Sequence, residues 1–136
     1  MNTLSENTYV NKAEQVIKTL QSRKNDRNGR TIPMVATSKI RNLLAMTSDI
    51  YNDVINNEEE NLSSECRERI EYLYIRFIYE IGRDDKQYGG VKDFAETADI
   101  LKIIKEIEGS RKNYIMFNRY MEALVAFHRY YGGKDL

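Results

Sequence analysis

Cysteine, proline and histidine each occur only once among the 136 residues, and tryptophan is absent. The lone Cys66 excludes an internal disulfide and any CxxC zinc or redox motif, and such cysteine usage is typical of a reducing cytosol. One proline and seven glycines are too few for the frequent turns of an all-β sandwich or barrel. No apolar run approaches the roughly 20 residues of a membrane span, and the polar first residues lack the apolar core of a signal peptide. We therefore expect a cytoplasmic protein with no membrane partner.

An excess of one charge sign is also lacking. Lys and Arg total 21 and Asp and Glu total 21, so the formal net charge is zero. This balance argues against a protein that coats nucleic acid or membranes indiscriminately, and it leaves room for a small basic patch offset by acids elsewhere. With 41% apolar residues, a chain of this length fits one domain and can bury a core without disulfides or a metal.

Apolar residues recur at spacings of three and four along most of the chain, which predicts amphipathic helices. Cap and stop signals divide this pattern into five helices, at residues 6–21, 37–55, 63–81, 91–107 and 110–131. Thr37 or Ser38 is the expected N-cap of the second helix, and Ser110 that of the last. The helix at 63–81 is apolar nearly all round, which is typical of the central element of a bundle.

The predicted fold class is all-α: a single helical domain over residues 1–136, folded as a bundle of about five helices. Residues 1–32 are expected to form a more loosely attached N-terminal helix and a basic linker, and residues 33–133 the core bundle. The linker at 22–33 contains four bases, one acid and an Asn28-Gly29 turn signal. We expect it to be mobile.

Residues that could carry chemistry are scarce. A nucleophile needs a base beside it, and the only histidine, His128, lies in an apolar run that favours a core residue with one hydrogen-bond partner. Cys66 lies near a helix start, where the dipole could lower its pKa, but a structural thiol is the stronger interpretation. No Glu-x-x-His pair is present, so the metal site of some helical bundles is lacking. The sequence predicts no enzyme, no cofactor and no metal site.

Basic residues gather in two places although the total charge vanishes. Lys39 and Arg41 lie in the first turn of a predicted helix, where the dipole and free N–H groups favour phosphate. Arg111 and Lys112 begin the last helix, Arg119 falls nearly in line with Lys112, and Arg129 follows further along. If the two helix starts were adjacent in space, they would grip a phosphate backbone. The candidate phosphate-binding residues are Lys39, Arg41, Arg111, Lys112, Arg119 and Arg129, and an ordinary solvated face is an equally favoured interpretation of these bases.

A stripe of alternating arginine and tyrosine follows the third predicted helix, with members at Arg69, Tyr72, Arg76, Tyr79 and Arg83. Such a stripe could stack bases and hold phosphates. The interpretation that we favour is structural, with the tyrosines packed at a helix interface and the arginines paired with Glu65, Glu68 or Glu80.

Two stretches, Val35–Met46 with its TSKIRN piece and Ser110–Gly133 with its RYMEALVAFH piece, are together similar to a known family. They resemble the small subunit of the type III-A CRISPR effector, the Csm complex, with a match from about Ile32 to Gly133. The resemblance implies a helical bundle without enzymatic activity. It further implies copies that stack head to tail beside guide-binding backbone subunits.

Because of this resemblance, we expect the chain to bind guide RNA and target RNA through phosphates and to associate with other copies of itself. The expected protein partners are the backbone subunit and the large subunit of the complex, and the expected role is antiviral defence. The acidic region at 49–60 could contact a basic patch on the next copy. The alternative is a generic helical interaction module, such as a dimerising regulator, without RNA binding. A sequence-specific DNA-binding protein is less favoured, because no helix-turn-helix is evident.

Overall fold

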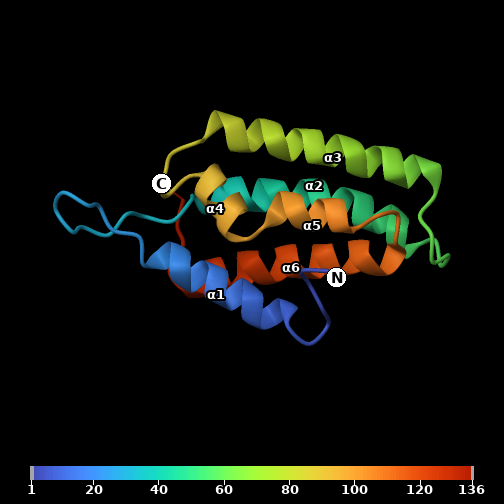
Figure 1. Ribbon diagram of the computed structural model, residues 1–136, viewed down its shortest axis with the longest axis horizontal. Helices are drawn as coiled ribbons and strands as arrows, with labels where there is room; N and C mark the ends of the chain where they lie inside the picture. The colour runs from blue at the N-terminus through green and yellow to red at the C-terminus, as the bar shows by residue number, and fades with distance from the viewer. Residues whose placement is uncertain (1, 136) are drawn as a thin grey trace.

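The computed structural model describes residues 2–135, and all of its regular structure in that range is helical (Figure 1). The all-α fold class is therefore confirmed. The helices number six within these residues, where the sequence predicted about five, because one expected helix is divided in two. They are α1 (Tyr9–Gln21), α2 (Thr37–Ile55), α3 (Ser64–Arg83), α4 (Val91–Thr97), α5 (Ile100–Glu106) and α6 (Arg111–Tyr130).

Helix α6 is the central element of the bundle. It packs against α1, α2 and α5 and has no solvent-exposed surface at Phe117, Met121 or Leu124. Two buried hydroxyls fix its neighbours, because Tyr114 donates to the Thr47 carbonyl at 2.6 Å and Tyr120 donates to the Ala98 carbonyl at 2.9 Å. Burial raises the pKa of both tyrosines, so the hydroxyls remain protonated donors.

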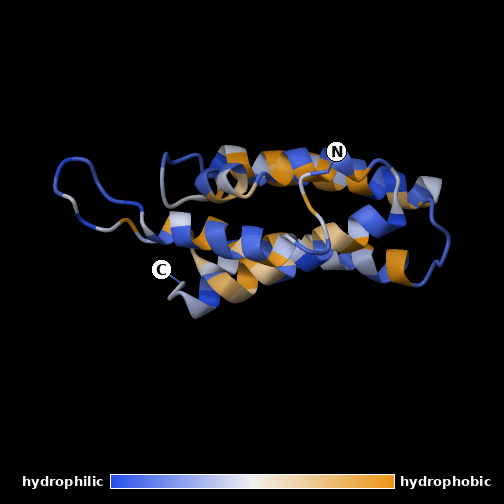
Figure 2. Cartoon of the chain, turned by 60° about the horizontal axis from the view of Figure 1, so that its bottom comes forward, coloured by the Kyte–Doolittle hydropathy of each residue, from blue (hydrophilic) through white to orange (hydrophobic). Residues whose placement is uncertain are grey.

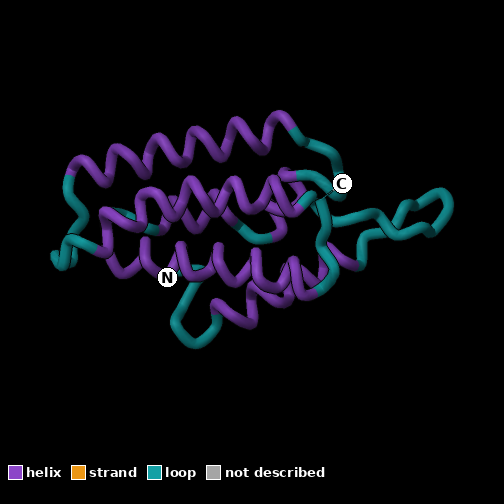
Figure 3. Tube along the Cα trace, turned by 180° about the vertical axis from the view of Figure 1, so that it is seen from behind, coloured by secondary structure: helices purple, strands orange, loops and turns teal. Residues whose placement is uncertain are grey.

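The prediction that the helix at 63–81 is central is wrong. Helix α3 lies along one edge of the bundle in both Figure 1 and Figure 3. Its inward face buries Cys66, Ile70, Leu73 and Phe77. Four further apolar residues of α3 face solvent, namely Tyr72, Ile75, Ile78 and Tyr79. A helix that is apolar all round is usually buried all round, so this outward face needs its own explanation.

The expected single helix at 91–107 breaks at Ala98 and Asp99. Asp99 adopts a left-handed backbone with φ of 58°, a conformation that asparagine and aspartate tolerate better than most residues. Contacts from other elements surround the break, since Ala98 accepts the Tyr120 hydroxyl and the Asp99 carboxylate binds Lys12 Nζ at 2.9 Å. The break therefore lets one short segment pack against both α1 and α6.

The N-terminal helix is firmly packed, contrary to the expectation of loose attachment. Helix α1 lies against α6 and fully buries Ala13 and Ile17. The segment at 22–33, expected to be a linker, contains regular backbone pairing. It forms a hairpin in which the Asn25 N–H donates to the Arg30 carbonyl and the Ile32 N–H donates to the Arg23 carbonyl, both at 2.8 Å. The hairpin projects from the end of the bundle and is mostly hydrophilic (Figure 2).

Of the two helix caps predicted from the sequence, one is confirmed. Ser110 caps α6 as predicted, because it accepts from the Asn113 N–H at 3.2 Å, and Ser63 caps α3 by accepting from the Cys66 N–H at 3.1 Å. The expected cap of α2 is wrong, because its N-cap residue is Ala36, which has no side-chain acceptor. The C-terminal tail satisfies the first N–H groups of α2 instead, as described below.

Candidate nucleic-acid interface

The two basic helix starts lie at opposite ends of the bundle. Helices α2 and α6 are antiparallel, because the Thr37 N–H donates to the Lys134 carbonyl at one end while Arg111 contacts the Val54 carbonyl at the other. At about 1.5 Å per residue, Lys39 and Lys112 are therefore roughly 25 Å apart. The two helix starts are therefore not adjacent, which was the condition for them to form one phosphate grip.

The start of α2 instead shares its end of the bundle with other bases. The last turn of α6, the C-terminal tail and the projecting hairpin all lie at this end (Figure 1). We call it the basic end and define it by Lys24, Arg27, Arg30, Lys39, Arg41, Arg129 and Lys134. The sequence pattern assigns the hairpin bases no role and does not place Lys134 beside α2. Only the tertiary contact from the Lys134 carbonyl to α2 shows that relationship.

Lys39 is partly neutralised within the chain. Its Nζ lies 2.6 Å from Asp84 Oδ2, and Lys86 approaches the other carboxylate oxygen at 3.8 Å. Asp84 also accepts the backbone N–H of Val91 at 3.2 Å. Burial alone raises the pKa of Asp84, but the bonds from Lys39 and Val91 and the nearby positive charges lower it overall. The carboxylate therefore stays ionised beside Lys39.

The N-terminus of α2 already has an anion. Asp135 Oδ1 accepts the Ser38 N–H at 2.7 Å, and the Lys134 carbonyl accepts the Thr37 N–H at 3.1 Å. A carboxylate in this position interacts favourably with the positive end of the helix dipole. The first backbone N–H groups of α2 were expected to be free to bind phosphate. The C-terminal tail of the chain already accepts hydrogen bonds from two of them.

The Arg111 side chain is hydrogen-bonded to the C-terminal end of α2. Its guanidinium donates to the carbonyls of Asn57 at 2.8 Å, Val54 at 3.3 Å and Ile55 at 3.3 Å. These carbonyls belong to the last turn of α2 and the residues after it, where backbone acceptors lack helical partners. The contacts make Arg111 a C-terminal cap for α2.

The remaining predicted residues are accessible. Arg41, Lys112 and Arg119 are exposed, and within residues 2–135 the structure gives their side chains no ion pair. Arg129 is also exposed and makes one contact, at 3.3 Å, to the Gly133 carbonyl. Lys112, Arg119 and Arg129 all lie on the solvent-facing side of α6, where Arg129 is turned about 80° from Arg119 and the exposed Glu122 lies between these two. We call these three residues the α6 basic line.

The end of the bundle opposite the basic end carries an excess of acids. The loop after α2 holds Glu58, Glu59 and Glu60, all exposed, and the first turns of α3 and the end of α5 add further carboxylates. We call Glu58 to Glu60 the acidic loop. Although the net charge of the chain is zero, the two ends of the bundle carry opposite charge.

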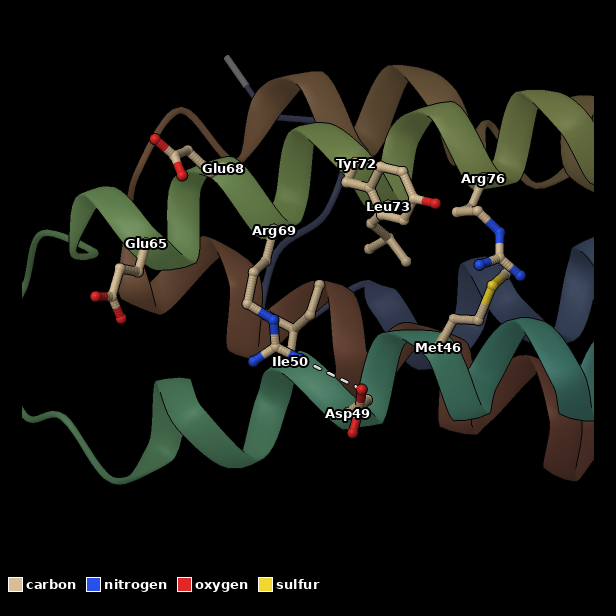
Figure 4. Close-up of a pocket in the computed structure, with 9 residues that line it drawn as sticks. All are labelled: Met46, Asp49, Ile50, Glu65, Glu68, Arg69, Tyr72, Leu73 and Arg76. Carbon is tan, nitrogen blue, oxygen red and sulfur yellow. Dashed lines mark hydrogen bonds and ion pairs between the residues drawn. The ribbon is translucent and has the colours of Figure 1, made fainter.

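The arginine and tyrosine stripe on α3 differs from the favoured interpretation. Tyr72 and Tyr79 are exposed, so they pack at no helix interface within the chain. Arg69 pairs with Asp49 and Asp53 of α2 and not with a neighbouring glutamate, whereas Arg83 does pair with Glu80 at 3.2 Å. Figure 4 shows Arg69 reaching across the groove between α2 and α3 toward Asp49.

His128 has the structural role that its apolar surroundings favoured. Its ring is fully buried and Nε2 lies 2.7 Å from the Val35 carbonyl, to which it donates. Burial lowers the pKa of His128, which favours the neutral ring. Over residues 2–135 no group of three or more His, Cys, Asp or Glu side chains could hold a metal ion. In the same range, no helix is both long enough and apolar enough to cross a membrane.

These features define a small helical-bundle protein with opposite charge at its two ends and an exposed basic line along its central helix. The sequence matches the family model described as Csm2 Type III-A over residues 8–134. The chain therefore belongs to the Csm2 family, the small subunit of the type III-A CRISPR complex.

Curated relatives agree with this membership. A protein of Streptococcus thermophilus named CRISPR system Cms protein Csm2 is 39% identical over 132 residues, which cover 97% of this chain and 98% of that protein. Proteins of the same name from Mycobacterium tuberculosis (strain CDC 1551 / Oshkosh) and Enterococcus italicus are 34% and 31% identical. These two alignments cover 93% and 90% of this chain and 94% and 88% of the relatives.

Proposed function

We propose that this chain is a non-catalytic subunit that stacks as a filament and binds the phosphate backbone of target RNA and guide RNA in antiviral defence. Its protein partners in this role are other copies of itself and the backbone and large subunits of the complex, and its place is the cytoplasm. Membership of the Csm2 family supports the setting. The RNA contacts and the stacking are argued from the charges described above.

The observation that carries the RNA-binding proposal is the α6 basic line together with Arg41. Lys112, Arg119 and Arg129 are exposed along the whole length of α6, and Arg41 is exposed on the antiparallel helix beside it. A protein that holds RNA without reading its sequence needs Lys and Arg spread along a path and no apparatus for base edges. We assign the main phosphate contacts to Arg41, Lys112, Arg119 and Arg129. Lys39 is a weaker contact because Asp84 already neutralises it.

Stacking is supported by the opposite charges of the two ends. In a head-to-tail arrangement, the acidic loop of one copy faces the basic end of the next. The basic hairpin projects beyond the helices at one end, and the acidic loop is exposed at the other. Both surfaces are polar, so we expect this contact to orient the copies and to weaken with salt.

The RNA contacts can be tested in the assembled complex, with guide RNA and all subunits present. Affinity for a labelled target RNA is measured at several salt concentrations for the wild type, Arg41→Ala and Arg119→Ala. We expect each variant to bind more weakly, and each lost phosphate contact to flatten the log–log salt dependence by roughly 0.7 to 0.9. Because every stacked copy carries the substitution, the loss multiplies with copy number.

The matched control is Lys102→Ala, which removes an exposed lysine from α5, away from the α6 basic line. We expect it to leave the affinity and the salt slope unchanged. Wild-type affinity and slope for both arginine variants would contradict the RNA-binding proposal. That outcome would favour the alternative, a helical interaction module without RNA binding.

A further inference from the structure

The outward face of α3 is the most apolar exposed surface of the described residues. Tyr72, Ile75, Ile78 and Tyr79 are 60%, 59%, 46% and 61% exposed, and they lie within two turns of one helix. Contiguous apolar surface of this kind marks an interaction site, because exposing it to water is unfavourable. The opposite face of α3 already packs on the bundle through Ile70, Leu73 and Phe77.

The outward residues of α3 are spaced like the seam of a coiled coil. Glu68, Glu71, Ile75, Ile78 and Gly82 follow one another at alternating steps of three and four, which keeps them on one face. Gly82, at one end of this seam, is not required by the bundle itself. A Cβ at this position would meet nothing within 4 Å, and its backbone does not need positive φ.

Charge along this face is divided between the two halves of the helix. Glu65, Glu68 and Glu71 lie exposed in the first half together with Arg67, whereas Arg76 and Arg83 lie exposed in the second half, where Glu80 is half-buried. Arg83 contacts Glu80 at 3.2 Å, but 61% of its side chain is exposed, so it remains available to a second acid. The face is therefore complementary to itself when the helix direction is reversed.

We propose that α3 pairs with α3 of a second copy of this chain, antiparallel, across a two-fold axis near Ile75. In this arrangement Ile75 contacts its own equivalent, and Tyr72 approaches Tyr79 of the second copy. Glu68 lies seven residues before Ile75 and Gly82 seven after it, so Glu68 reaches the turn that holds Gly82 and Arg83. An isologous interface requires each contact to occur twice, and this one forms the Glu68 to Arg83 pair on both sides.

This α3 pairing is independent of the proposed head-to-tail stacking. A two-fold interface closes at two copies, whereas head-to-tail contacts between opposite ends do not close. The pairing uses the edge helix α3, while the stacking uses the ends of the bundle and the RNA contacts use α6 (Figure 1). Failure of one proposal therefore leaves the other standing.

Sedimentation equilibrium of the full-length chain without RNA tests the pairing, up to about 100 µM and near 0.15 M salt. We expect the wild type to change from one 16.0 kDa chain to two as concentration rises. Ile75→Glu is expected to stay monomeric, because it places two charges at the axis. The matched control is Val10→Glu on α1, an equally polar change at another exposed apolar residue, which is expected to dimerise like the wild type.

A charge exchange tests the antiparallel geometry. Glu68→Arg alone and Arg83→Glu alone each disturb two pairs, and we expect each to raise the dimer Kd about tenfold. The double variant in one chain restores both pairs and is expected to dimerise nearly like the wild type. An equimolar mixture of the two single variants is also expected to form heterodimers. Circular dichroism checks that every variant keeps the helical content of the wild type.

Three results would overturn the pairing. The first is a wild type that remains monomeric at the highest concentration. The second is association that Ile75→Glu does not weaken, whether it stops at two copies or continues to larger species. The third is a double variant that dimerises no better than the two single variants, since this would remove the Glu68 to Arg83 contact.

Discussion

Lys39 Nζ lies 2.6 Å from Asp84 Oδ2, so the first turn of α2 is joined by an ion pair to the loop that follows α3. Asp84 is held there by Val91, and a Cβ at Gly90 would come within 2.6 Å of the same carboxylate. The pair fixes how α2, α3 and α4 meet. It also places a negative charge within the basic end, where RNA phosphates are proposed to approach.

Asp84→Asn is therefore expected to strengthen binding of target RNA to the assembled complex by about two- to threefold at low salt. The amide keeps an acceptor for Lys39 but no longer neutralises it. Lys39→Ala should consequently reduce the affinity for target RNA more in the Asp84→Asn background than in the wild type. A double-mutant cycle measures this coupling. Asp85→Asn removes a charge from the same loop without touching Lys39. Equal coupling of Lys39 to both substitutions would show that only net charge matters.

Arg111 predicts an effect on stability instead of RNA binding. Arg111→Ala removes the donors for three carbonyls at the end of α2 and is expected to destabilise the fold by about 1–2 kcal/mol. A thermal melt should show a lower Tm by several degrees. Arg111→Lys should recover only part of the loss, because an ammonium lacks the planar fork. Lys112→Ala, one residue along and exposed, is the control and should melt like the wild type. Similar Tm values for Arg111→Ala and the control would contradict the capping role.

The buried ring of His128 predicts loss of stability in mild acid. Burial lowers its pKa in the folded chain below the ordinary value of 6.5, so the unfolded chain binds more protons as the pH falls through that value. The free energy of unfolding should decrease below about pH 6.5, by at most about 1.4 kcal/mol per pH unit from this group. Denaturant unfolding between about pH 7.5 and 5.5 measures the slope. His128→Gln should flatten it, and an unchanged slope in that variant would assign the effect to other groups.

Head-to-tail stacking predicts sensitivity to the acidic loop. Converting Glu58, Glu59 and Glu60 to lysine should weaken attraction to the basic end of the next copy. Native mass spectrometry of the reconstituted complex should then count fewer copies of this chain per complex, and the deficit should shrink as salt rises. Gln15→Lys combined with Glu96→Lys, at two exposed positions on α1 and α4, is a comparison that also adds positive charge but spares the acidic loop. An unchanged copy number for the acidic-loop variant would argue against contact between the ends.

Much of the fold could be predicted from periodicity, because spacing alone identifies which segments are helical. Periodicity could not identify the side of α3 that is buried, since Ile70 and Ile75 have the same polarity and only tertiary packing distinguishes them. Periodicity also could not predict the helix break at Asp99. The left-handed backbone there is accompanied by contacts from Tyr120 and Lys12, which are far away in the sequence. The hairpin at 22–33 could not be predicted, because its composition is that of a linker.

The sequence shows which basic residues are available for a site but not how they are arranged. Lys39 and Lys112 look alike in sequence, but the antiparallel packing of α2 and α6 places them at opposite ends of the bundle. Arg111 and Lys112 are neighbours in sequence, yet only Arg111 donates hydrogen bonds to the three carbonyls at the end of α2. The anion at the start of α2 comes from Asp135, at the other end of the chain, and no local pattern predicts it.

The most direct measurement is a tagged pull-down of this protein from its native host, with sequencing of the co-purifying RNA and identification of the proteins. We expect to recover short guide RNAs that share a repeat-derived end, together with the backbone and large subunits of a type III-A complex. Recovery of the protein alone, or with unrelated partners and no guide RNA, would contradict the proposed role.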